Sequence, residues 1–150
     1  NSVQEEVGLK GAGMIAERLR PDVAIVTDVT HDTTTPMIDQ KAHGTTRIGE
    51  GPVIAYAPAV QNRLREHIVA AAERREIPFQ RQARAPATGT DTDAFAYSHQ
   101  GVASALIALS LRYMHTTVEM VHRQDVENVI RLIHESVKSI ETGQRFSYFD

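Results

Sequence analysis

The chain has 150 residues, a formal net charge of −3 and 41% hydrophobic residues, which fits one compact soluble domain. Its mild acidity argues against a nucleic-acid partner, because phosphate binding favours a basic face, and the absence of cysteine excludes disulfide bonds, thiolate metal sites and a cysteine nucleophile. The sequence has no signal peptide and no run of about 18 apolar residues, so we expect a cytoplasmic protein that does not bind a membrane.

The first third of the chain predicts a strand, a helix, a second strand and a loop. Val3 has the place of a strand end, and the chain starts without methionine, so we expect the 150 residues to be part of a longer protein. Pro21 ends a helix whose apolar face carries Ala12, Ile15, Ala16 and Leu19. The continuous apolar run at residues 23–26 is typical of a strand buried on both faces. The polar residues 30–50 predict a long loop, and such loops are often functional.

The rest of the chain continues the alternation. Apolar runs predict strands at residues 52–56, 77–82 and 105–109. Apolar residues at helical spacing, or a capping turn, predict helices at residues 62–75, 91–97 and 124–142, of which the last ends at Gly143. We expect this last helix to bury an apolar stripe made of Val126, Val129, Ile130, Ile133, Val137 and Ile140. The pattern predicts the α/β class, with helices packed on a largely parallel sheet.

Polar residues that follow the predicted strands indicate a functional site. In an open α/β sheet, ligands bind at the carboxyl ends of the strands. Glu5 and Glu6 follow the first strand, Asp28 follows the second, and His115 comes shortly after the last. Their oxygen and imidazole donors suit zinc, cobalt or manganese. Neighbouring side chains in extended backbone point to opposite sides, so one glutamate can bind a cation while the other acts as a general base.

Each of these residues also has a structural interpretation. Consecutive glutamates are common on charged surfaces, an aspartate after a strand can cap a turn, and a single histidine is often a hydrogen-bonded core residue. Their shared position after apolar strands favours the site. The turn at residues 89–91 either caps a helix or brings Thr90 and Asp91 to the substrate cleft, and Arg112 is a further cleft residue that could orient His115. We expect structural or solvated roles for the remaining histidines: His31, His43, His67, His99, His122 and His134.

Five segments of the sequence resemble the dinuclear metallo-aminopeptidases of the TET type, which are also called glutamyl or deblocking aminopeptidases. In the order of the family, and over nearly the whole chain, these segments are Gln4–Ala12, Val26–His31, Gly51–Ile54, Gly89–Asp91 and Arg112–Thr116. The resemblance implies a three-layer sandwich in which helices flank a largely parallel, mixed sheet. It also implies two divalent metal ions, zinc or cobalt, a peptide substrate, and a homo-oligomer, either a dimer or a dodecamer.

The resemblance also implies a role for each residue of the predicted site. It makes Glu5 the general base, Glu6 and His115 the ligands of one metal ion, and Asp28 a ligand of the other. The family's site further uses a histidine and a metal-bridging aspartate to which nothing in this sequence corresponds, and its small inserted β domain is absent as well. We therefore expect residues 1–150 to be the C-terminal portion of the catalytic domain. Since a bridging carboxylate holds two cations about 3.5–4 Å apart, we expect the chain alone to be inactive and to bind metal weakly.

The predicted function is metal-dependent hydrolysis of the amino-terminal residue from peptides. One alternative is a related dinuclear enzyme, a deacylase or carboxypeptidase that acts on N-acyl amino acids. Another is a non-catalytic fragment that completes an assembly with another chain. A glycosidase is not supported, because it needs paired carboxylates across a sugar cleft, and the residues here are better interpreted as metal ligands.

Overall fold

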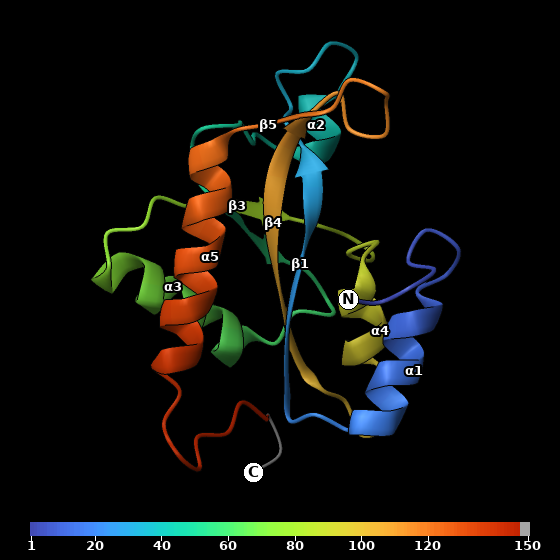
Figure 1. Ribbon diagram of the computed structural model, residues 1–150, viewed down its shortest axis with the longest axis vertical. Helices are drawn as coiled ribbons and strands as arrows, with labels where there is room; N and C mark the ends of the chain where they lie inside the picture. Colours follow the sequence, from blue (N-terminus) through green and yellow to red (C-terminus); the bar gives the residue numbers. More distant parts are fainter. Residues whose placement is uncertain (148–150) are drawn as a thin grey trace.

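Two long parallel strands form the centre of the fold (Figure 1). The computed structural model describes residues 1–147. β1 (Val23–His31) pairs in parallel with β4 (Ala103–Arg112), and β4 pairs on its other side with the antiparallel β2 (Val53–Tyr56). β3 (Gln80–Ala83) lies parallel to β2, and the short β5 (Met120–Val121) pairs with β4. The strand order β1-β4-β2-β3 gives a mixed sheet, and the predicted α/β class is confirmed.

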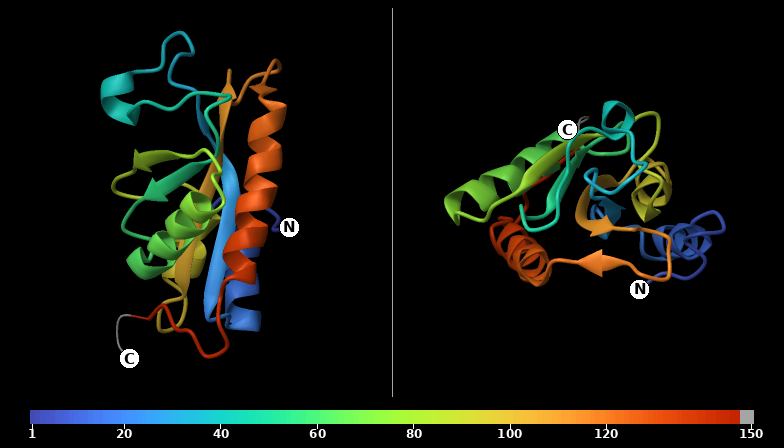
Figure 2. Two further views of the ribbon diagram at one scale, coloured as in Figure 1. Left: turned by 90° about the vertical axis from the view of Figure 1, so that its left-hand side faces the viewer. Right: turned by 90° about the horizontal axis from the view of Figure 1, so that it is seen from above.

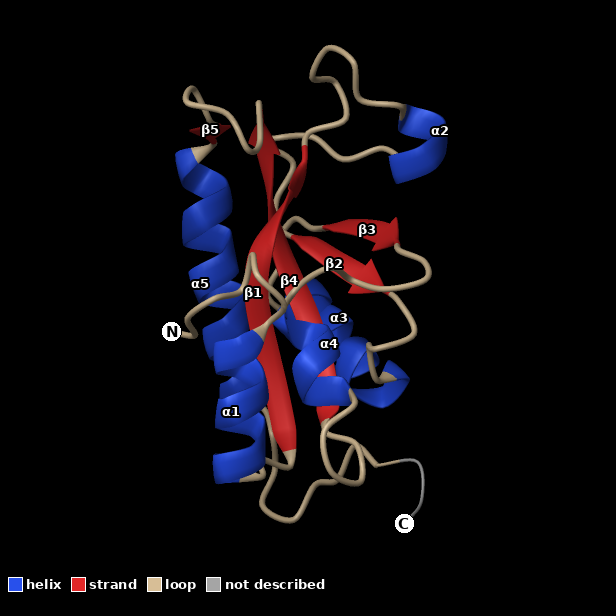
Figure 3. Cartoon of the chain, turned by 90° about the vertical axis from the view of Figure 1, so that its right-hand side faces the viewer, coloured by secondary structure: helices blue, strands red, loops and turns tan. Residues whose placement is uncertain are grey.

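Helices flank both faces of this sheet and make three layers (Figures 1 and 2). α1 (Lys10–Leu19) and α4 (Asp91–Ala96) pack together on one side, and α3 (Asn62–Arg74) and α5 (Arg123–Lys138) pack together on the other. The single turn α2 (Gln40–His43) stands apart in the long loop after β1 (Figure 3). No helix in the described part of the chain is long and apolar enough to cross a membrane.

The core is centred on β4, whose successive side chains point to opposite faces of the sheet. Ile107 packs with Leu64, Ile68 and Leu132 beneath α3 and α5, while Leu106 belongs to a second cluster on the other face. Each fully buried side chain of this size contributes about 1.5–3 kcal/mol of hydrophobic stabilisation. β1 has a different environment, because among the described residues it lies at the edge of the sheet, and only two of its residues, Ala24 and Thr30, are buried. The predicted burial of residues 23–26 on both faces is therefore wrong.

Residues 1–9 form a bend and turns, so the strand end predicted at Val3 is wrong. The carbonyl oxygens of this segment accept hydrogen bonds from residues just before α1 and in its first turn instead of from another strand. The Glu5 carbonyl accepts from the amides of Gly8 and Leu9, and the Val3 carbonyl accepts from the amide of Gly11 at 2.9 Å. The segment thus winds directly into α1, with Glu5 and Glu6 in its turn.

The buried face of α5 differs from the predicted apolar stripe. Ile130 and Val137 are 62% and 53% exposed, and the helix ends at Lys138, before Ile140 and Gly143. Five residues of α5 are buried, of which three are polar (Asp125, Asn128 and Ser136) and two are apolar (Val129 and Leu132). The helix is oriented so that the Asp125 carboxylate accepts hydrogen bonds from the amides of Gly49 and Gly51, at 2.6 and 2.9 Å.

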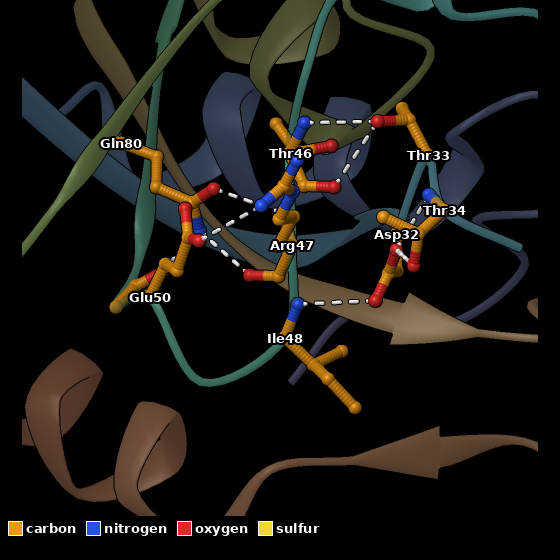
Figure 4. Close-up of polar contacts among 9 residues, drawn as sticks. Asp32, Thr33, Thr34, Thr46, Arg47, Ile48, Glu50 and Gln80 are labelled. Atoms are coloured by element: carbon orange, nitrogen blue, oxygen red, sulfur yellow. Dashed lines mark hydrogen bonds and ion pairs between the residues drawn. The ribbon is translucent and has the colours of Figure 1, made fainter.

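The long loop after β1 is held by polar contacts at its base (Figure 4). The buried Asp32 carboxylate accepts hydrogen bonds from the amide and hydroxyl of Thr34, at 2.7 and 2.6 Å, and from the amide of Ile48, at 3.2 Å. Burial would raise the pKa of Asp32, but these hydrogen bonds favour the carboxylate and lower the pKa below its ordinary value. The loop therefore begins and ends at fixed positions.

Candidate functional site

A cavity of about 400 Å³ opens beside the carboxyl ends of β1 and β3. The four side chains predicted to form the site, Glu5, Glu6, Asp28 and His115, all line this cavity. They come from three places: the turn before α1, the C-terminal half of β1 and the turn after β4. Residues that are as many as 110 positions apart in the sequence thus face one space.

Glu6 and His115 lie within ion-pair distance of each other. The Oε1 atom of Glu6 lies 3.7 Å from Nε2 of His115, and both side chains are exposed. His115 has a positive φ of 64° in the turn after β4, where its amide donates to the Glu119 carboxylate. This turn directs the imidazole toward the residue 5–6 turn, although the two segments are remote in sequence.

Two carboxylates of the cavity, Glu5 and Asp28, have raised pKa values. For Glu5 the first cause is burial, and the nearby charges of Asp28, Glu6 and Asp91 raise its pKa further, against the opposing effect of His115. For Asp28 the first cause is again burial, and the Val29 amide, which donates to Oδ1 at 2.7 Å, only partly offsets it. Several anionic groups are thus crowded into one space, which is the electrostatic environment that a bound cation would relieve.

These donors fit divalent cations in their chemistry. Carboxylate oxygen and imidazole nitrogen are ligands that zinc and cobalt both accept. Within residues 1–147, however, no three histidine, aspartate or glutamate side chains converge on one point. Glu6 and His115 could share one cation, and Asp28 could contribute to another, so the described residues offer fewer ligands than a closed site needs.

Of the three residues predicted to line the cleft, one lines the cavity and two do not. Thr90 is buried and lines it. Asp91 lies behind this wall, where its carboxylate accepts a hydrogen bond from the Ser2 hydroxyl. Arg112 is outside the cavity, and its guanidinium lies over the Tyr113 ring, 5.4 Å from the centroid.

Six further polar residues that the sequence did not assign to the cavity also line it: Thr30, His31, His43, Gln82, Arg84 and Thr88. His31 ends β1, and its ring makes an edge contact with the His43 ring at 5.6 Å between centroids. Gln82 and Arg84 are at the end of β3. The signal for His31 was its place three residues after Asp28, whereas Gln82 and Arg84 stand in a polar segment without a recognisable motif.

His31 should make the stability of the chain pH-dependent. Burial lowers its pKa, and the charges of His43, His115 and Arg84 lower it further. Because the unfolded chain then binds the proton more readily, stability is full above the ordinary histidine pKa of about 6.5 and declines as the pH falls below it. We expect an NMR titration of the His31 ring to have its midpoint below about 6.5, and His31→Asn to reduce the loss of melting temperature between neutral and mildly acidic pH. A midpoint at or above the ordinary value would contradict this.

Comparison with known proteins gives consistent matches. The profile of the M42 glutamyl aminopeptidases matches residues 1–132. Lysyl aminopeptidase of Pyrococcus furiosus is 36% identical over 131 residues, which are 87% of this chain and 37% of that protein. The TET aminopeptidase of Thaumarchaeota archaeon SCGC AB-539-E09 superimposes with a TM-score of 0.85 at 32% identity, over 93% of this chain and 39% of that one.

Other solved structures share the same fold. Aminopeptidase APDkam598 of Desulfurococcus kamchatkensis has a TM-score of 0.80 at 34% identity, over 91% of this chain and 39% of that one. The TET1 peptidase of Pyrococcus horikoshii, which can assemble into a tetrahedron or a large octahedral shell, has a TM-score of 0.70 at 27% identity, over 91% of this chain and 38% of that one. This chain therefore spans about two fifths of the length of the proteins it matches. With its profile match extending from residue 1 to residue 132, the chain belongs to the M42 glutamyl aminopeptidase family.

Proposed function

We propose that this chain carries part of the active site of a metal-dependent aminopeptidase, which hydrolyses the amino-terminal residue from peptides. The observation that carries the proposal is the gathering of Glu5, Glu6, Asp28 and His115 around one cavity. Membership of the M42 family supports the same reaction class. The gathered side chains are a base and three cation ligands, which are the groups that such a hydrolysis needs.

Each residue has a separate task in this proposal. Glu6 and His115 would hold one divalent cation and Asp28 another, with zinc and cobalt both acceptable. When bound, the cations would supply Lewis-acid polarisation of the scissile carbonyl and lower the pKa of a water. Glu5 accepts the proton of the attacking water and passes it to the leaving amine. The raised pKa of Glu5 suits this task, because it moves the carboxylate closer to the pH at which a base works best.

The number of ligands indicates that the proposed site needs more protein than residues 1–147 provide. One cation has two candidate ligands in the described residues and the other has one, while a catalytic site commonly has three protein ligands for a cation. We propose that further ligands, including a bridging carboxylate, come from outside these residues. The shells that P. horikoshii TET1 can form support a homo-oligomer as the working state.

Substrate profiling tests the proposed reaction. In a preparation with the full length of the relatives, zinc or cobalt should support release of the first residue from peptides with a free amino terminus. The same peptides with an acetylated amino terminus should not be cleaved. Preference for the acetylated set would instead favour the N-acyl amino acid deacylase. Residues 1–150 alone serve as the control, and cleavage by them would contradict the requirement for further ligands.

A further inference from the structure

The position of α2 determines one wall of the cavity, although α2 has little contact with the body of the protein. None of its four residues is buried. Even so, Ala42 and His43 line the cavity, opposite the turn that carries Glu5 and Glu6. Figures 2 and 3 show α2 projecting from the top of the sheet on the long loop. Whatever fixes α2 therefore fixes the size of the cavity.

The side chain of Gln82 connects α2 to the sheet. It is only 5% exposed, and its amide nitrogen donates to the His43 carbonyl oxygen at 3.0 Å. Its Oε1 atom accepts from the Thr30 hydroxyl and from Nε of Arg84, both at 3.1 Å. One buried side chain thus joins β1, β3 and α2 through donor and acceptor contacts that are chemically distinct.

The contacts of His43 and Gln40 complete the attachment of α2. The ring of His43 touches that of His31 at 5.6 Å between centroids. Gln40 donates to the Thr33 carbonyl at 3.0 Å, which ties α2 to its own loop and not to the sheet. The hydrogen bond from Gln82 is therefore the polar contact that holds α2 against the sheet.

Gln80 holds a different part of the same loop. It precedes Gln82 by two residues, so both side chains leave the same face of β3. Its Oε1 accepts from the Arg47 amide at 2.9 Å, and its amide nitrogen donates to the carbonyls of Arg47 and Gly51, at 2.9 and 2.8 Å (Figure 4). The base of the loop is thus secured independently of α2.

We infer that Gln82 is a positioning residue that holds α2 in place as a movable wall of the cavity. With the bond to His43 made, α2 is held in a position in which its residues Ala42 and His43 line the cavity. When that bond is lost, the remaining contacts leave α2 tied to the loop but free to move from the sheet. The base of the loop, which Gln80, Asp32 and Asp125 secure, stays in position. The role of Gln82 in holding α2 does not depend on the proposed reaction. Only the effect of α2 on substrate binding rests on that proposal.

The substitution Gln82→Glu removes the hydrogen bond that Gln82 donates and keeps the two that it accepts. A glutamate can still accept from Thr30 and Arg84, but it cannot donate to the His43 carbonyl and repels it. Loss of one hydrogen bond should therefore raise amide hydrogen exchange of Ala42, His43 and Gly44 by about fivefold or more. The melting temperature should stay close to that of the wild type, because the contacts within the sheet are kept. The measurement uses residues 1–150, with exchange read residue by residue by NMR.

Gln80→Glu is the matched control. It makes the same chemical change two residues away, keeps the contact from the Arg47 amide and loses the two donated bonds. Exchange should then rise around residues 47–51 and not in α2. The inference would be overturned if α2 exchanged at the wild-type rate in Gln82→Glu, or if both variants accelerated it equally.

A kinetic measurement adds a second readout in a preparation that cleaves peptides. Gln82→Glu should raise KM and leave kcat nearly unchanged, because the base and the cation ligands are intact, whereas Gln80→Glu should change neither constant. An equal fall of kcat in both variants would indicate a general structural defect and overturn the positioning role. Should no preparation cleave peptides, the proposed reaction fails while the exchange result still decides whether Gln82 holds α2.

Discussion

Replacement of Glu5 by glutamine is expected to lower kcat by about 10²–10⁴-fold in an active preparation, without loss of bound metal. Glutamine keeps the size and shape of the side chain but cannot accept a proton from the attacking water. Since Glu6, Asp28 and His115 are unchanged, the proposed cation ligands in this part of the site remain. Release of the first residue from a peptide measures kcat, and elemental analysis of the dialysed protein measures the metal content.

The control for this variant is Glu17→Gln, which makes the same change on the exposed face of α1, outside the candidate cavity. It should keep both kcat and metal content. If Glu5→Gln lost metal in proportion to its activity, Glu5 would be a ligand and another group would be the base.

Asp125→Ala is expected to lower the free energy of unfolding by about 3–5 kcal/mol. Asp125 is fully buried, and its two oxygens accept from the amides of Gly49 and Gly51. Alanine would leave both amides without these partners, at a cost of about 1–3 kcal/mol each. Since small domains are stable by only about 5–15 kcal/mol, this is a large share of the total. Denaturant unfolding followed by circular dichroism measures the change.

Glu127→Ala tests whether the effect is specific to Asp125. Glu127 lies on the same helix, and its carboxylate pairs with the exposed Arg123 four residues earlier, at 2.9 Å. Such a surface pair contributes about 0–1 kcal/mol, so its loss should change stability little. Equal destabilisation by both variants would mean that α5 is sensitive to any substitution, and that the contacts with Gly49 and Gly51 are not the cause.

Much of the fold was predictable because local periodicity and burial agree in the core. The strands at residues 53–56 and 103–112 and the helix Asn62–Arg74 follow directly from apolar runs and helical spacing. The exceptions arise where a tertiary partner overrides the pattern. Asp125 is buried because distant amides need an acceptor, and Ile130 is exposed as a consequence of the same helix orientation. Hydrophobic periodicity contains no information about such partners.

The site likewise combines residues that the sequence could indicate with residues that matter only through tertiary contacts. Glu5, Glu6, Asp28 and His115 could be proposed from sequence because each is a cation-binding residue type placed after a predicted strand. The strand predicted before Glu5 and Glu6 is not formed and Asp28 lies within β1, yet the structure brings all four to one cavity. Their roles as base and ligands stay predictions. Gln82 could not have been found in this way, because its importance lies in a hydrogen bond to the His43 carbonyl, an atom that every residue has. Main-chain acceptors leave no signature in a sequence.

The pairing of β1 with β4 has a consequence for how the molecule folds. Val23 lies beside Ala103 and His31 beside Leu111, so the central ladder joins segments about 80 residues apart. Contacts of such long range form slowly, because the intervening chain must be ordered first. During synthesis β1 would be exposed as an unpaired apolar edge until β4 has left the ribosome. We therefore expect Asp28 and His115 to come together only once β1 and β4 have paired.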